Sequence, residues 1–131
     1  MVNWIMKCVS TTSFSLNVNR ELHGFFQGKR GLRQGDPLSL YLFTIVMEVL
    51  TLMLKREVSE SELFKYHLKC DKLEIVNLCF ADDLFLLSCT YKESVMVIAN
   101  ALEEFKLCSG LVPTLPKSTV FLANCSIATK N

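Results

Sequence analysis

The sequence lacks the cysteine and histidine patterns of a zinc site or a disulfide scaffold. Its six cysteines include no Cys-x-x-Cys pair, and it has only two histidines. The net charge is only +1, so a nucleic-acid partner would have to be bound by a local basic patch rather than by the whole surface. Cys79, Cys89 and Cys108 lie in apolar segments, which favours small buried hydrophobes in an intracellular, reducing compartment.

We also expect neither a signal peptide nor a membrane span. Residues 1–7 lack the charged start and long apolar core of a signal peptide. The longest apolar run, Leu38 to Leu54, carries Glu48 in its interior, and a charge at mid-span costs on the order of 3 kcal/mol. The sequence therefore predicts no membrane partner.

The apolar residues are sufficient for one core. The chain has 131 residues, of which 50% are hydrophobic, and this is the size of a single domain. A short helix is expected over residues 2–10. Strict alternation then predicts a strand over residues 13–18, followed by a turn at Asn19-Arg20-Glu21 and a returning strand over residues 24–27.

Two long helices are expected to supply most of the core. Asp36 as N-cap and Pro37 at the first helical position begin one helix, which runs to about Arg56. The other begins with a capping box at Thr90 and ends at Gly110. The predicted inward residues are Leu38, Leu42, Ile45, Val46, Val49 and Met53 in the first helix, and Val95, Ile98, Leu102 and Phe105 in the second. The first helix also carries a polar stripe of Thr44, Glu48, Thr51 and Lys55.

The remaining segments give weaker signals. Residues 57–62 are polar and are expected to form a linker. A short strand with a turn at 70–72 is expected within residues 63–73, and a last strand over residues 119–123.

A glycine-rich basic loop over residues 28–37 precedes the first long helix. Lys29, Arg30 and Arg33 place three cations within five positions. The loop lacks the Gly-Lys-Ser/Thr signature of a nucleotide phosphate loop, although helix N-termini favour anions. A solvated basic loop and an anion-binding loop both fit this pattern.

Phe80-Ala81-Asp82-Asp83 lies between two short apolar runs, Ile75–Cys79 and Leu84–Leu87. Together they predict a strand, a tight turn and a second strand, buried on both faces. Adjacent carboxylates on a regular strand point to opposite faces, so only a turn lets both reach one point. A divalent cation would relieve their repulsion. For the pair taken alone, two turn aspartates that face water are the better interpretation.

The loop and the hairpin together resemble the palm of a reverse transcriptase, most closely that of non-LTR (LINE-type) retrotransposons. Gly31-Leu32-Arg33-Gln34-Gly35-Asp36-Pro37-Leu38-Ser39 lies roughly 45 residues before the hairpin, and Ser109-Gly110-Leu111 and Pro116-Lys117-Ser118 follow it. The resemblance implies an α+β fold. The expected fold is a partial polymerase palm, in which an antiparallel sheet packs on two long helices and one hairpin of the sheet carries Asp-Asp. Residues 1–131 would form this single partial domain.

The resemblance also implies a reaction and its site. A primer 3′-hydroxyl would attack the α-phosphate of a deoxynucleoside triphosphate, paired to an RNA or DNA template. Two Mg²⁺ (or Mn²⁺) ions would lower the pKa of the hydroxyl and stabilise the pyrophosphate. Asp82 and Asp83 would be the metal-binding catalytic residues, and Lys117 would lie near the triphosphate. The other contacts implied are Arg33, Gln34 and Gly35 at the template and nascent base pair, and Phe80 beside the primer end.

One part of the family's site is missing from the sequence. The family has a third metal-binding carboxylate on an earlier strand, in a Phe-Asp-x-x-x-Asp-type segment, whereas this chain has no acidic residue before Glu21. The fingers and thumb are expected to be absent too, and the metal ions are expected only if the site is completed. Without that strand, a hydrophobic strand edge would be open to a partner chain.

Three hypotheses follow. The favoured one is a truncated palm that is inactive alone. In the second, a partner chain completes the site. In the third, the chain is a non-catalytic, retroelement-derived nucleic-acid-binding or interaction module that acts through Lys29, Arg30 and Arg33.

Overall fold

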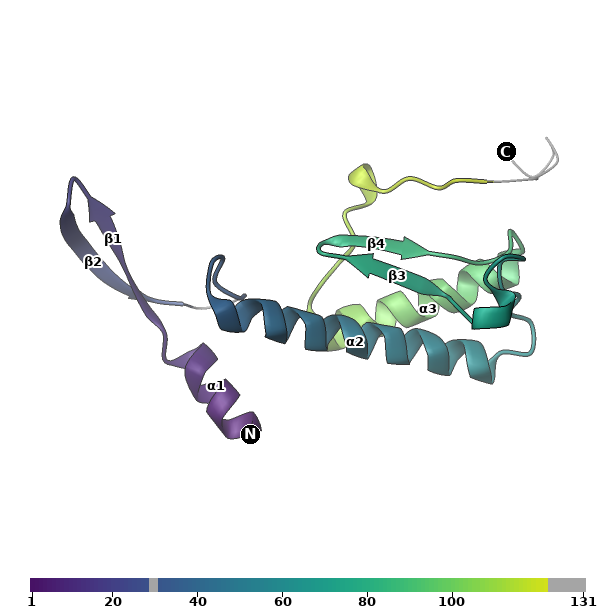
Figure 1. The fold of residues 1–131 in the computed structure, drawn as a ribbon, viewed down its shortest axis with the longest axis horizontal. Coiled ribbons are helices and arrows are strands. Elements are labelled where there is room, and N and C mark those ends of the chain that lie inside the picture. Colours follow the sequence, from purple (N-terminus) through teal and green to yellow (C-terminus); the bar gives the residue numbers. More distant parts are fainter. Residues whose placement is uncertain (29–30, 123–131) are drawn as a thin grey trace. The chain divides into compact units, whose positions relative to one another are not determined.

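The computed structural model describes residues 1–28 and 31–122. The described elements are α1 (Val2–Ser10), β1 (Ser13–Val18), β2 (Glu21–Gln27), α2 (Pro37–Glu60), the 3-10 helix η1 (Asp71–Leu73), β3 (Asn77–Phe80), β4 (Asp83–Leu86), α3 (Lys92–Ser109) and the 3-10 helix η2 (Leu115–Lys117) (Figure 1). Helices combined with antiparallel strands confirm the predicted α+β class. The chain divides into two compact units, Met1–Phe43 and Thr44–Asn131.

The first unit contains α1, the β1–β2 hairpin and the loop before α2. The two strands pair antiparallel, from Ser13↔Gln27 to Val18↔Glu21. Asn19 and Arg20 form the turn with φ of 53° and 70°, as tight hairpin turns often require. The helix, the first strand and the turn are therefore confirmed. The returning strand begins at Glu21, earlier than predicted, because Gly24 at φ 63° absorbs an irregularity in the pairing.

The core of the second unit is formed by α2, α3 and the β3–β4 hairpin. Its buried residues are Leu50, Leu54, Val58, Val76, Ile98, Ala101 and Phe105. Leu84 and Leu86 of β4 pack against this cluster, so one face of the hairpin lies on the helices. The opposite face carries Leu78, Phe80 and Phe85, which are 54%, 80% and 56% exposed. The prediction that these strands are buried on both faces is therefore wrong.

The predicted buried face of α2 is partly wrong. Ile45 and Val49 are 57% and 41% exposed, whereas Leu50 and Leu54 are 1% and 0% exposed. Apolar residues surround most of this helix, so their spacing fits more than one face. Val58 is also buried, and α2 continues to Glu60 through much of the segment predicted as a linker.

Helix α2 is long and apolar enough to cross a membrane by length and composition. Core helices of soluble proteins pass the same test, and α2 contributes Leu50, Leu54 and Val58 to the core. The absence of a membrane span stays a prediction.

Helix α3 is predicted well at its end and less well at its start. Gly110 terminates it with φ 71°, as expected. Its N-cap is Tyr91 and makes no side-chain hydrogen bond, so the capping box predicted at Thr90 is wrong. Val95 is 52% exposed, and the neighbouring Ser94 is buried in its place. The Ser94 hydroxyl accepts a hydrogen bond from the Lys65 backbone N–H at 3.0 Å, which satisfies a buried polar group.

Two predicted strands do not form within the described residues. Residues 61–70 make turns and irregular backbone, although the turn at 70–72 is confirmed. Residues 118–122 have no strand partner, and Ala123 lies outside the described residues. An apolar run forms a strand only where a neighbouring strand bonds its backbone N–H and C=O groups. Among the described residues, β3 and β4 pair only with each other, so neither segment has such a neighbour.

Replacing Leu54 by Ala is expected to lower the free energy of unfolding by about 2–5 kcal/mol, because it leaves a cavity in the core. Leu52 lies half a turn away and is 57% exposed. Leu52→Ala is therefore the matched control, with an expected change within about 0.5 kcal/mol. Urea unfolding followed by circular dichroism measures both, and equal effects of the two substitutions would contradict this placement of the core.

Candidate functional site

The β3–β4 hairpin brings the two predicted catalytic aspartates to its tip. Phe80 pairs with Asp83, which leaves Ala81 and Asp82 as the two turn residues. Ala81 has φ 51°, a left-handed value that a residue with a side chain rarely adopts. The predicted strand, tight turn and second strand are thus confirmed. Backbone strain of this kind is concentrated in proteins at functional sites.

Both carboxylates are exposed and available to a ligand. Ion pairs in the described chain join Glu21 to His23, Arg56 to Glu57 and Glu104, and Glu103 to Lys106. Neither Asp82 nor Asp83 takes part in these pairs. No group of three His, Cys, Asp or Glu side chains that could hold a metal occurs among residues 1–28 and 31–122. Because Mg²⁺ commonly binds one or two carboxylates plus substrate phosphates, this pair suits one such ion and is too small a set for two.

Phe80 and Lys117 are predicted site residues that belong to the same unit as the aspartates. Phe80 is 80% exposed on the outer face of β3. Lys117 ends η2, where its backbone N–H donates to the Thr114 carbonyl at 2.9 Å. Lys117 is exposed, and no ion pair joins it to either aspartate in the described chain.

The predicted template-contacting residues belong to the first unit. Asp36 caps α2 as predicted, because its Oδ1 accepts a hydrogen bond from the Leu38 N–H at 2.9 Å. The preceding loop carries Arg33, Gln34 and Gly35, all exposed, and Gly35 has φ 85°. Lys29 and Arg30 lie outside the described residues. The predicted site residues therefore fall into two groups, one in each unit.

A cavity of about 420 Å³ adjoins this loop within the first unit. Arg33 lines it and places its guanidinium 5.3 Å from the centre of the Phe14 ring. Phe14 and Phe26 line it as well, with ring centres 5.7 Å apart. Sequence reasoning placed Phe14 on one side of a strand but missed these two rings as neighbours of the loop. The alternation of residues 13–18 gives the side of the strand on which Phe14 lies, but it carries no signal for the contact with Arg33.

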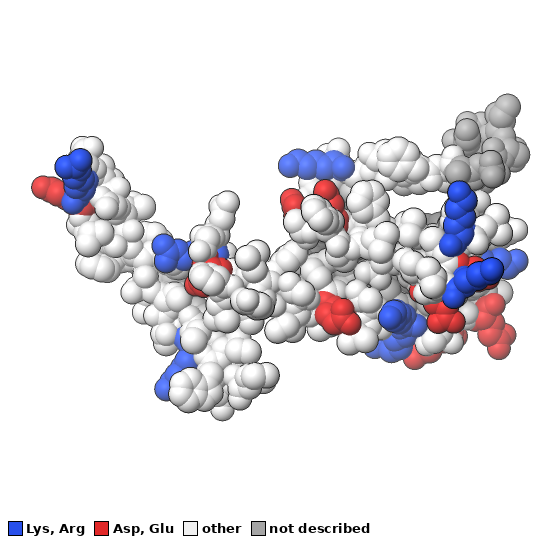
Figure 2. Space-filling view, viewed as in Figure 1, with Lys and Arg blue, Asp and Glu red and all other residues white. Residues whose placement is uncertain are grey.

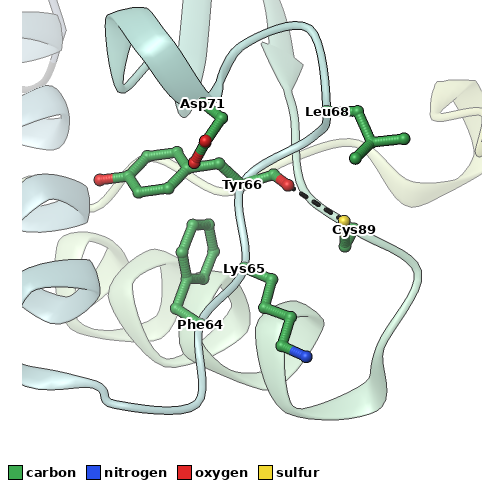
Figure 3. Close-up of a pocket in the computed structure, with 6 residues that line it drawn as sticks. All are labelled: Phe64, Lys65, Tyr66, Leu68, Asp71 and Cys89. Atoms are coloured by element: carbon green, nitrogen blue, oxygen red, sulfur yellow. Dashed lines mark hydrogen bonds between the residues drawn. The ribbon is translucent and has the colours of Figure 1, made fainter.

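A second, open cavity of about 320 Å³ lies in the second unit. Figure 3 shows its six lining residues, Phe64, Lys65, Tyr66, Leu68, Asp71 and Cys89, with the Cys89 thiol donating to the Tyr66 carbonyl at 3.0 Å. Burial raises the pKa of Tyr66, and the negative charges of Glu74 and Asp71 raise it further. Sequence reasoning did not identify this cavity, and none of the predicted site residues lines it.

The visible side of the second unit does not carry a broad basic face (Figure 2). On the side of the second unit shown in Figure 2, Lys and Arg atoms are interspersed with Asp and Glu atoms. Arg56 is an example, because its guanidinium pairs with both Glu57 and Glu104. The expectation of a local rather than a global nucleic-acid contact agrees with this distribution.

Comparison with known proteins identifies the family. Residues 1–128 match the model of the family described as reverse transcriptase (RNA-dependent DNA polymerase). This chain belongs to the reverse transcriptase family. An uncharacterized mitochondrial protein from Arabidopsis thaliana is 39% identical over 66 residues, which cover 50% of this chain and 54% of that protein. The chain thus spans about half the length of this relative, and no solved structure matches the chain significantly.

The reverse transcriptase match covers both the basic loop and the Asp-Asp hairpin. It therefore confirms the family on which the predicted site rests. The LINE-type assignment and the role of each residue stay predictions.

The unmodified protein is expected to lose stability at high pH, in part because Tyr66 has a raised pKa, and Tyr66→Phe should remove that part of the loss. Since the pKa of Tyr66 is raised from its ordinary value of 10.0, the folded protein keeps the phenolic proton after the unfolded chain has lost it. The free energy of unfolding should therefore fall as pH rises through 10 towards the raised pKa. Urea unfolding at several pH values, with Tyr41→Phe as an exposed control, measures this. The same pH dependence in Tyr66→Phe and the unmodified protein would contradict it.

Proposed function

We propose that residues 1–131 form the part of an RNA-directed DNA polymerase palm that carries the metal-binding hairpin and the template-contacting loop. The observation that carries this proposal is the two-residue turn that holds Asp82 next to Asp83 at an exposed tip, within a chain of the reverse transcriptase family. We further propose that the chain derives from a LINE-type retrotransposon and that it does not extend a primer alone.

Asp82 and Asp83 bind a divalent cation, Mg²⁺ or Mn²⁺, together with the phosphates of a deoxynucleoside triphosphate. Their exposure and their lack of ion-pair partners in the described chain support this role, because no other charge competes for the carboxylate oxygens. The cation, when bound, supplies positive charge to the phosphoryl group and its leaving oxygen. Lys117 adds a cation for the triphosphate, and the exposed ring of Phe80 packs beside the primer end.

Arg33, Gln34 and Gly35 contact the template strand and the nascent base pair. All three are exposed at the start of a well-capped helix, which supports a fixed placement of the loop. The guanidinium of Arg33 is planar and always charged, so it suits both phosphate binding and stacking. Lys29 and Arg30 add positive charge to the same loop.

The carboxylate pair limits what the chain does alone. Two metal ions need a third carboxylate, and the sequence has no acidic residue before Glu21. A partner chain could supply it by pairing with the free edge of β3 or β4, since within residues 1–28 and 31–122 each pairs on one side only. The 131 residues by themselves are therefore expected to bind substrate components without catalysing transfer.

Primer extension tests this proposal directly. The purified 131-residue chain is incubated with a primed RNA template, deoxynucleoside triphosphates and either Mg²⁺ or Mn²⁺. We expect no extended primer above the level given by the Asp82→Ala variant, because the metal site lacks a third carboxylate. Extension that Asp82→Ala abolishes would contradict the proposed inactivity while confirming the role of Asp82.

A second candidate function is a non-catalytic nucleic-acid-binding module. The aromatic and cationic lining of the cavity beside Arg33 favours it, because single-stranded nucleic acids bind by stacking on aromatic rings beside positive charge. Salt-sensitive RNA binding that Arg33→Gln weakens and Arg20→Gln does not, without any metal binding at the hairpin, would support this function instead.

A further inference from the structure

A polar side-chain contact joins the Asp-Asp hairpin to α2. Asn77, the first residue of β3, donates from Nδ2 to Thr51 Oγ1 at 2.9 Å. The Thr51 hydroxyl in turn donates to the Met47 carbonyl at 3.2 Å. Within residues 1–28 and 31–122, this is the only side-chain hydrogen bond between the hairpin and a long helix. It therefore links the strand that leads to Asp82 with the helical backbone.

The other contacts of the hairpin give little directional restraint. Leu84 and Leu86 pack on the core, but apolar contacts are non-directional and allow sliding. Each strand has four residues, and an isolated two-stranded hairpin is marginally stable. The outer face is exposed, so nothing described covers it. The Asn77–Thr51 hydrogen bond is thus the directional side-chain contact between β3 and α2 in the described part of the chain.

Both partners of this hydrogen bond are themselves held in place. Thr51 lies between two core positions of α2, Leu50 at 1% and Leu54 at 0% exposure. The amide of Asn77 also contacts Cys79 Sγ at 3.6 Å, which keeps the Asn77 side chain on the inner face of β3. Val76, immediately before Asn77, is 3% exposed. At Thr51, the polar stripe of α2 therefore supplies a hydroxyl that accepts a hydrogen bond from the side-chain amide of Asn77 in β3.

We propose that Asn77 and Thr51 are positioning residues for the turn at Asp82 and Asp83. Their hydrogen bond holds β3 in one placement on α2 and keeps both carboxylates in the arrangement that binds a divalent cation. The inference rests on the proposed metal-binding role of the two aspartates. If the hydrogen bond is lost, other hairpin placements become populated, and the apparent affinity falls with the fraction that remains competent.

Mn²⁺ titration of the full 131-residue chain tests the proposal, with paramagnetic broadening of the Asp82 and Asp83 amide signals as the readout. Thr51→Val removes the hydroxyl at nearly constant volume, and Asn77→Ala removes the other partner. We expect each to weaken Mn²⁺ binding roughly fivefold, the size of effect that one hydrogen bond gives. The double variant should be no weaker than either single variant, because one interaction is lost in all three.

Two controls separate positioning from general destabilisation. Thr51→Ser keeps the acceptor and should restore the affinity, and Ser59→Ala removes an exposed α2 hydroxyl that bonds only to Arg56 of its own helix. Amide hydrogen exchange supplies a readout independent of the metal. Thr51→Val should speed exchange in β3 and β4 relative to α3, whereas a uniform loss of stability would speed both.

The outcomes distinguish this inference from the function on which it rests. Mn²⁺ binding at the hairpin with equal affinity in the unmodified chain, Thr51→Val and Asn77→Ala would overturn the positioning role alone. No Mn²⁺ response in the unmodified chain would overturn the metal-binding role and the positioning role together. If Thr51→Val does not fold, Asn77→Ala, which removes the other partner of the same part-buried hydrogen bond, decides the question.

Discussion

The tight turn between β3 and β4 is the constraint on which the candidate site depends. Adjacent residues of a strand point to opposite faces, so Asp82 and Asp83 serve one ligand only if the backbone reverses at that point. The structure achieves this with a two-residue turn in which Ala81 has φ 51°. Such a conformation is unfavourable for Ala and persists only because the flanking strands are paired and one of their faces lies on the helices.

The rest of the second unit supports this turn. Leu84 and Leu86 pack on a core formed mainly by α2 and α3, and Asn77 adds a directional bond to Thr51. Gly110 ends α3 in the left-handed conformation and returns the chain towards η2, which carries Lys117. The exposed hairpin tip therefore depends on the buried residues of α2 and α3.

Most features determined by local interactions could be predicted from the sequence, and the capping box expected at Thr90 is the exception. The cap at Asp36, the helix end at Gly110 and the turn at Asn19-Arg20 depend on residues close in the chain. Features that need a distant partner could not. Spacing alone did not distinguish Leu50 and Leu54 from Ile45 and Val49 as the buried face of α2, and residues 119–122 found no strand to pair with in the described chain.

The candidate site shows the same division. The residue pattern identified Asp82, Asp83 and the loop at Arg33, because their order and spacing along the chain resemble a family, and the match over residues 1–128 confirms that family. The contact of Asn77 with Thr51, 26 positions apart, and the placement of Phe14 beside Arg33 could not be predicted, because each depends on how distant segments pack.

The central claim is that the hairpin carboxylates form a metal site. The most direct test is to titrate Mn²⁺ into the unmodified chain and into the Asp82→Asn variant and to monitor binding by nuclear magnetic resonance. If the hairpin carboxylates form a metal site, Mn²⁺ will broaden the amide signals of the β3–β4 turn at concentrations that leave the signals around Glu103 and Glu104 unchanged. Asp82→Asn will abolish this selectivity. Equal broadening at the turn and at these α3 carboxylates, or selective broadening that survives Asp82→Asn, would contradict the account.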